Sequence, residues 1–360
     1  MRIIKGTGKM SLGLLISGPV GLYHYYSPDH GIDIYLFSDH HGVRNNPKAN
    51  CNGPSISIED FIINVLKINQ DKQIQVFLET TVLISGKMDK TPFLDRRLSY
   101  IQDVVRKLEV CIVPLRNTAN NTGRTRNRQP QCKYSNLQIH PIDFRSDREI
   151  NIWTYFITLH EGMEIKDSPA EVVRHVEKIY RALVRLHQRY PNLNPVILLV
   201  KFYDVDGLME STSKTVDKLL WKEIMDYLQV QINKLIPGGM EELLTGLQDF
   251  LLNYNNLAIG LHDLSSFLIP YVEAETWIVE YYTWAQIFGA PSPLAAQMFS
   301  REPGSAAAPQ KNILYYAGNY HTQSTSGLLK YLNFTLLERT RNSGQCLNIK
   351  NFKPIFGTKY

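Results

Sequence analysis

The sequence lacks the features that mark several common protein classes. Its 360 residues include only four cysteines, none in a Cys-x-x-Cys pair, which argues against a zinc ribbon or a dense disulfide scaffold and favours reduced thiols. No apolar run approaches the ~18 residues that a membrane span requires. The glycine-interrupted N-terminus contains no small-residue cleavage site of a signal peptide. These absences predict an intracellular, soluble chain with no membrane span.

Motifs of familiar enzyme classes are missing as well. The chain has no Gly-x-Ser-x-Gly elbow, no Gly-x-x-x-x-Gly-Lys-Ser/Thr loop and no Gly-x-Gly-x-x-Gly opening a helix, which leaves α/β-hydrolase, P-loop and dinucleotide-binding functions unsupported. It also lacks the Gly-Asp dipeptide that a calcineurin-like phosphoesterase needs. Lys and Arg number 39 against 34 Asp and Glu. That excess is too small to predict a nucleic-acid partner.

Short apolar runs separated by helical segments predict an α/β fold with a central, largely parallel sheet flanked by helices. Ser57 is the expected N-cap of a helix that connects the first two of these strands, and strand, helix and strand make a βαβ unit. The predicted strands are 32–37, 74–78, 137–142 and 312–317.

The remaining segments are expected to belong to one α/β domain over residues 1–360. Polar and basic composition predicts an exposed loop at 115–135. A hairpin or meander is expected within 1–26, a helix to about Glu338 after the last strand, and an irregular tail at 341–360. A mostly helical portion, 151–300, is predicted to contain helices at 151–161, 169–189, 213–235, 240–252 and 264–288.

Polar residues follow three of the predicted strands at the point where each strand stops. Asp39-His40-His41 ends the first strand, Glu79 the second and His321 follows the last. Parallel strands end at one edge of a sheet, so we expect these side chains to face one cleft. Histidine and carboxylate both bind divalent metals and transfer protons near neutral pH. The alternative is that each residue only caps a turn or lies at the surface.

Further acids, bases and thiols are candidates for the same site. Arg145 could bind a substrate carboxylate or phosphate, although a structural pair with Asp143 or Asp147 is the favoured interpretation. The acids Glu273, Glu275 and Glu280 lie on one predicted helix, where solvated positions are the usual outcome. The four cysteines are expected to be core residues, with only Cys51 near enough to the Asp-His-His segment to be a ligand.

The order of the strand-end motifs resembles the layout of erythromycin esterases, Tiki-type metalloproteases and haem-binding ChaN-type proteins. Those families combine a Gly-Glu-x-His-like strand end, a glutamate on the second strand and a late Gly-x-x-His. Here Ser38-Asp39 replaces Gly-Glu, so the first acid is one carbon shorter. Uncharacterised proteins of large DNA viruses are more closely similar, in three blocks: Leu36–His41, Ile139–Arg145 and Tyr315–His321.

The resemblance implies a viral origin and a set of residue roles. His41 or His40 is the first catalytic or ligand histidine, Glu79 is the second-strand acid and His321 is the late histidine. Asn319 and, apart from the resemblance, Arg145 in its less favoured interpretation are the candidates for contact with the substrate. A divalent metal, if one is bound, would be held by Asp39, His40, His41 and His321.

Two functions of different classes follow from these assignments. The first is a hydrolase of ester or amide bonds, acting on a small molecule or a peptide with a His/Glu site, either metal-bound or metal-free. The second is a catalytically inactive virion or host-interaction protein, which would use the loop 115–135 and the tail 351–360 for contacts with a protein partner. Both predict a location in the host cytoplasm or the virion.

Overall fold

The computed structural model describes about two thirds of the chain and divides it into two compact units, 1–143 with 304–360, and 144–303. His41 and Arg145 lie outside the described part, as does the expected loop 115–135 except for Lys133, Tyr134. The described residues are 15–40, 51, 53–81, 100–108, 111, 133–134, 136–143, 152–160, 162, 168–203, 208–256, 258–289, 311–342, 344–350 and 353–357.

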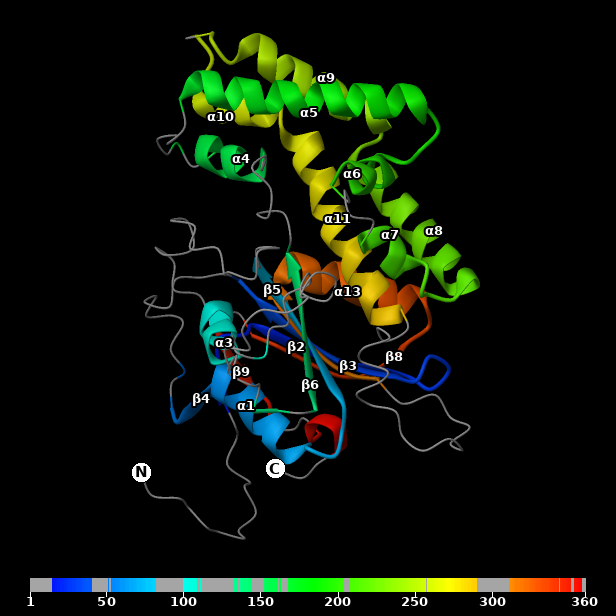
Figure 1. Ribbon diagram of the computed structural model, residues 1–360. Coiled ribbons are helices and arrows are strands. Elements are labelled where there is room, and N and C mark those ends of the chain that lie inside the picture. The colour runs from blue at the N-terminus through cyan, green and yellow to red at the C-terminus, as the bar shows by residue number, and fades with distance from the viewer. Residues whose placement is uncertain are drawn as a thin grey trace, which may run out of the picture. The chain divides into compact units, whose positions relative to one another are not determined.

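The first unit is built on a six-stranded sheet with the order β6-β5-β7-β3-β2-β8 (Figure 1). The predicted parallel core is confirmed, since every pairing among the four predicted strands, β6, β5, β7 and β3, is parallel. Two further strands, β2 and β8, extend the sheet in antiparallel fashion. The strands are β2 (Gly21–Ser27), β3 (Ile32–Asp39), β5 (Ile74–Thr81), β6 (Leu137–Asp143), β7 (Lys311–Gly318) and β8 (Thr335–Arg341).

Burial explains why the sequence pattern predicted the parallel strands but missed β8. Strands β3 and β7 are buried on both faces and therefore appear as continuous apolar runs. The predicted helix to Glu338 is wrong, because α13 (Asn319–Tyr331) ends earlier and β8 follows. Residues of β8 alternate between exposed and half-buried, as an edge strand requires. The predicted hairpin within 1–26 is also wrong for the described residues, since β1 (Leu15–Ser17) and β2 belong to different sheets.

Helices lie on both faces of the large sheet. On one face, α1 (Ile58–Ile68) and α3 (Tyr100–Leu108) pack over a hydrophobic core that includes Phe37, Leu78 and Tyr316. Ser57 caps α1 as predicted, because its hydroxyl accepts a hydrogen bond from the Asp60 N–H. On the other face, α13 contacts β7 and β3. The two faces of the sheet therefore pack against different helices: α1 and α3 on one side, α13 on the other.

A smaller sheet with the order β4-β1-β9 completes the first unit. Its strands are β1, β4 (Ser55–Ser57) and β9 (Cys346–Asn348). Cys51 and Cys346 form a disulfide across 295 residues, and Cys111 is also disulfide-bonded. The expectation of reduced thiols is wrong: residues distant in sequence become neighbours only when β1 pairs with both β4 and β9. Cys51 is thereby removed as a metal ligand.

The end of the chain packs against this core instead of forming a free tail. The short helix η4 (Ile355–Gly357) buries Ile355 and Phe356. The Phe356 N–H donates to the Tyr35 hydroxyl at 3.1 Å, and the two rings meet edge to face. The Lys72 ammonium donates to the Phe356 carbonyl. Burial at these positions reduces the part of the segment 351–360 that a partner could contact.

The second unit, within its described residues, is helical. The prediction of α5 (Pro169–Arg189) is confirmed at both ends, and Ser168 and Glu171 form its capping box. The predicted helix 213–235 begins later than expected, at Lys218, and the predicted helix 264–288 is interrupted after Ser266. Asp217 caps α8 (Lys218–Leu235) after the shorter α7 (Leu208–Ser213), and α10 (Leu261–Ser266) precedes α11 (Ile269–Phe288). The unit also contains α4 (Ile152–His160), α6 (Pro195–Tyr203) and α9 (Gly239–Asn253).

Helix α11 is buried on nearly all sides and contacts α6, α7, α8 and α9 within its unit. The Tyr203 hydroxyl donates to the Glu275 carboxylate at 2.5 Å and lies 2.6 Å from the Tyr271 hydroxyl. Burial and the neighbouring carboxylate hold the pKa of Tyr203 well above its ordinary value. No helix in the described part of either unit is both long enough and apolar enough to cross a membrane.

The disulfide predicts a measurable loss of stability when it is removed. We expect the double substitution Cys51→Ala and Cys346→Ala to lower the free energy of unfolding by about 2–4 kcal/mol, because the bond restricts the unfolded chain. Chemical denaturation followed by circular dichroism measures the loss, and peptide mapping without reductant should recover Cys51 linked to Cys346. Alkylation of both thiols in the native, unreduced protein would contradict the assignment.

Candidate functional site

The candidate site lies where β5 ends beside the start of α13. Strand β7 pairs with β5 up to Tyr316 and Leu78, so the residues that follow each strand are neighbours. Glu79 is the next residue of β5, and Gly318 is the N-cap of α13. The Gly318 N–H donates a hydrogen bond to Glu79 Oε2 at 2.5 Å. Sheet pairing therefore positions a carboxylate at the beginning of a helix.

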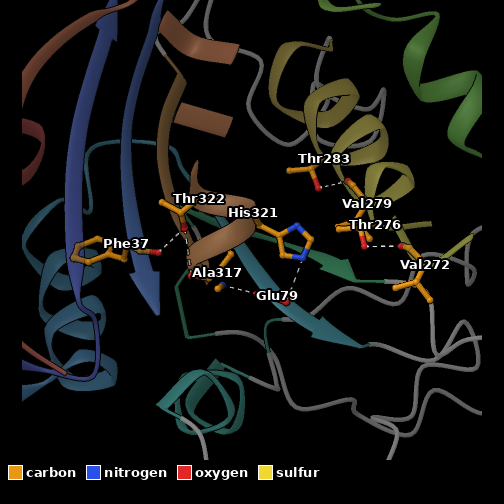
Figure 2. A network of polar contacts seen from close by, with 10 residues as sticks. Phe37, Glu79, Val272, Thr276, Val279, Thr283, Ala317, His321 and Thr322 are labelled. Atoms are coloured by element: carbon orange, nitrogen blue, oxygen red, sulfur yellow. Dashed lines mark hydrogen bonds and ion pairs between the residues drawn. The ribbon is translucent and has the colours of Figure 1, made fainter. Parts of the chain in front are cut away.

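His321 completes a carboxylate–imidazole pair with Glu79. Its Nε2 lies 3.3 Å from Glu79 Oε1, and Figure 2 shows the imidazole projecting from α13 towards the carboxylate. The two side chains retain only 5% and 11% of their exposure. The predicted proximity of Glu79 and His321 is confirmed. The two residues are 242 positions apart in the sequence, and the parallel pairing of β5 with β7 brings them together.

The electrostatics of the pair follow from its position at the helix N-terminus. The unpaired N–H groups of a first helical turn carry partial positive charge, which favours an anionic Glu79. The carboxylate in turn favours an N–H on Nε2, the nitrogen that faces it. The contact also directs the ring towards Glu79.

Hydrogen bonds to β3 and β7 hold the first turn of α13 in place. The Thr322 hydroxyl lies 3.4 Å from the Phe37 carbonyl and 3.3 Å from the Ala317 carbonyl, as Figure 2 shows. The Ser38 hydroxyl donates to Asn319 Oδ1 at 3.0 Å. Asn319, expected to contact substrate, is half-buried and is used at least partly in this structural bond. These hydrogen bonds therefore fix the backbone that carries His321.

Asp39 does not join Glu79 and His321. It is fully buried, and it accepts hydrogen bonds from the Tyr316 hydroxyl at 3.3 Å and from Gln345 Nε2 at 3.2 Å. Successive side chains of a strand point to opposite faces. Asp39 shares the face of Phe37 and Tyr316, under α1 and α3. Leu78 also belongs to that face, so Glu79, the next residue, points to the opposite face, which α13 covers. Strand ends that coincide at one edge can still direct their side chains to opposite faces.

The burial of Asp39 changes the chemistry of its partner. Burial, followed by the nearby carboxylate, raises the pKa of the Tyr316 hydroxyl well above its ordinary value. The phenol therefore stays protonated and remains a hydrogen-bond donor to Asp39. Tyr316 and Gln345 were not predicted as partners. The alternation of β7 could have placed Tyr316 on the face of Asp39, but no sequence signal links Gln345 to a residue 306 positions away.

The other predicted site residues divide into exposed and buried positions. His40 is exposed, and the paired His41 is outside the described residues. Within the described ranges, no three His, Cys, Asp or Glu side chains form a group that could hold a metal ion. Asp39 and His321, two members of the expected ligand set, point to different faces of the sheet. Contrary to the expectation of solvated acids, Glu275 and Glu280 are fully buried.

The arrangement can orient a base, and this is its clearest chemical property. A carboxylate bonded to one imidazole nitrogen raises the basicity of the other and holds it in one direction. Such a pair can accept a proton from water or from a hydroxyl group that reaches Nδ1. It can equally act as a structural bond between β5 and α13, because both side chains are largely buried.

The environment of Asp39 predicts a stability difference between two substitutions. Asp39→Ala leaves the buried Tyr316 hydroxyl and Gln345 amide without their acceptor, so we expect a loss of about 3 kcal/mol in unfolding free energy. Asp39→Asn retains an acceptor oxygen and should lose about 1 kcal/mol by the same reasoning. Urea denaturation compares the two variants, with the exposed Asp71→Ala as a control expected to change little. Equal losses in the two Asp39 variants would count against this bonding scheme.

Comparisons with known proteins add no external assignment to this geometry. No protein-family model matches the chain. Searches among curated proteins and among solved structures also found no match. The chemistry of the Glu79–His321 pair is therefore argued from its own atoms.

Proposed function

We propose that the chain is a hydrolase of ester or amide bonds in which His321, oriented by Glu79, is the general base. The observation that carries the proposal is the 3.3 Å contact between His321 Nε2 and Glu79 Oε1 at the N-terminus of α13. An ionised carboxylate and a neutral imidazole in this relation match the first requirement for activating water near neutral pH. The resemblance of the strand-end motifs to erythromycin esterases agrees with the same chemistry.

The proposed reaction uses His321 twice. Nδ1 accepts a proton from water while the water oxygen forms a bond to the substrate carbonyl carbon. Glu79 stabilises the resulting imidazolium by accepting its Nε2–H bond. The protonated ring then donates the same proton to the leaving alcohol or amine as the carbon–oxygen or carbon–nitrogen bond breaks. Ester or amide and water become acid and alcohol or amine, with the enzyme unchanged.

Asp39 has a supporting role in this proposal and no contact with the reacting atoms. It secures the end of β3 through Tyr316 and Gln345, while Ser38, the preceding residue, donates to Asn319 at the start of α13. The end of β3 thus links the core on one face to the helix that carries His321 on the other. Loss of Asp39 should affect catalysis only indirectly, through the position of this strand end.

A second candidate function is a catalytically inactive interaction protein on the same scaffold. The burial of both side chains in the Glu79–His321 pair favours it, because a base must be reached by water and substrate. In that case the pair connects β5 to α13 and contributes only to stability. The two functions differ in what happens to turnover when the ring is removed.

The hydrolase proposal is tested with chromogenic esters and peptide anilides on the full chain. We expect His321→Ala to reduce kcat about 10²–10⁴-fold, because general-base catalysis contributes that range. Glu79→Gln should also reduce kcat, since a neutral amide cannot stabilise the imidazolium. The exposed His262→Ala serves as the matched control, because it removes a solvent-facing imidazole from the other unit and should leave kcat unchanged.

Thermal unfolding of each variant separates the two functions. Loss of turnover in His321→Gln while the melting temperature stays near that of the parent chain would support a catalytic ring. No turnover of any substrate by the parent chain, or equal turnover in parent and His321→Ala, would overturn the hydrolase proposal. A large drop in melting temperature in an otherwise inactive chain would identify the pair as structural.

A further inference from the structure

One face of α5 carries five basic side chains. All five are exposed, and they follow one another at intervals of three or four residues, which places them on a single side of an α-helix. We call this set the basic stripe, and its members are Arg174, Lys178, Arg181, Arg185 and Arg189.

The opposite side of α5 is apolar and buried, so the helix is anchored with the basic stripe facing outward. Val172, Val176, Ile179 and Leu183 are buried there. Within its unit α5 contacts α6 and α9, and Figure 1 shows α9 beside it. At ~1.5 Å per residue, the stripe extends over about 22 Å. Because the apolar side is anchored, the five cations form a rigid line instead of a flexible basic tail.

Few acids neutralise this line. Glu177 pairs with Arg181 at 2.5 Å, and Glu171 is engaged in the capping box at the helix start. Arg174, Lys178 and Arg185 form no ion pair with any described residue. With five Lys or Arg against two Glu, α5 has an excess of three positive charges in 21 residues, whereas the whole chain has an excess of five in 360.

An aromatic side chain extends the stripe past the end of the helix. The Arg189 guanidinium lies 5.4 Å from the centre of the Tyr190 ring, and the Lys201 ammonium lies 5.5 Å from it. Lys201 is exposed and lies on the neighbouring α6. Cations beside a half-buried ring add further positive charge at the same end of the line.

We infer that the basic stripe is a binding surface for nucleic acid, recognised through its phosphate backbone. The ligand must present a line of regularly repeated negative charges, because the stripe repeats its cations along one direction. Four of the five cations are arginines, whose planar forks bind phosphate oxygens in pairs. Each strand of a duplex presents one phosphate per ~3.4 Å of its axis, so about 22 Å of helix faces several phosphates.

The surroundings of the stripe favour this ligand over a lipid surface. Peripheral helices that bind anionic bilayers insert aromatic or aliphatic side chains beside their cations. All of α5 is described, and none of its large apolar side chains is exposed. The small net charge of the chain had argued against nucleic acid, but binding depends on where charges gather as well as on their sum. Contacts to phosphate carry no base information, so we expect binding through the stripe to be independent of base sequence.

The test measures binding of the full chain to a fluorescent 20-base-pair DNA duplex and to a single-stranded RNA over a series of salt concentrations. Five phosphate contacts predict that affinity for the duplex falls about 500-fold between 50 and 200 mM salt. A triple variant, with Arg174→Gln, Lys178→Gln and Arg185→Gln, keeps two stripe cations. Its affinity for the duplex should fall only about 12-fold over the same range of salt. Glutamine keeps helix propensity near that of the parent residues.

A matched control removes the same charge elsewhere in the same unit. Lys214→Gln, Lys218→Gln and Lys222→Gln replace three exposed lysines, one in the turn after α7 and two in α8. The inference requires parent-like affinity and salt dependence in this control, with circular dichroism confirming the fold of both variants. Equal weakening in both triple variants, no binding of the parent to either nucleic acid at 50 mM salt, or binding to anionic vesicles alone would overturn it.

Discussion

The position of β7 between β3 and β5 is the constraint on which the candidate site depends. This strand comes from the last part of the chain, yet it lies at the centre of the parallel core. Its parallel pairing with β5 brings the start of α13 beside Glu79, and its pairing with β3 brings Asp39 beside Gly318. Any strand order in which β7 was not next to β5 would separate His321 from Glu79 by at least one further strand spacing of ~4.8 Å.

The same sheet divides the polar residues between its faces. Glu79 and His321 meet under α13, where the helix N-terminus supports a carboxylate. Asp39 is enclosed on the other face with Tyr316 and Gln345. Gln345 precedes Cys346, which is bound to Cys51, and Cys51 in turn follows the segment that begins at Asp39. A hydrogen bond at Asp39 and a covalent bond at Cys51 therefore tie both residues to the adjacent pair Gln345 and Cys346.

In the helical unit, the position of the charges matters more than the net charge of the chain. A modest net charge conceals a concentrated line of cations on α5, because acids elsewhere balance the sum. The helix is amphipathic in an uncommon way, with one side fixed in the core and the other almost uniformly basic. Rigid presentation of like charges costs electrostatic energy, which a polyanionic ligand would relieve.

Local patterns in the sequence were sufficient for the parallel strands, the Ser57 cap and the full extent of α5, because apolar periodicity and capping act over a few residues. They also placed Glu79 and His321 at strand ends. Tertiary structure alone decided that Asp39 faces away from them, that Gln345 supports it and that Cys51 bonds Cys346. Each of these depends on strand order or on the face to which a side chain points, and contacts across some 300 residues leave no periodic trace in the sequence.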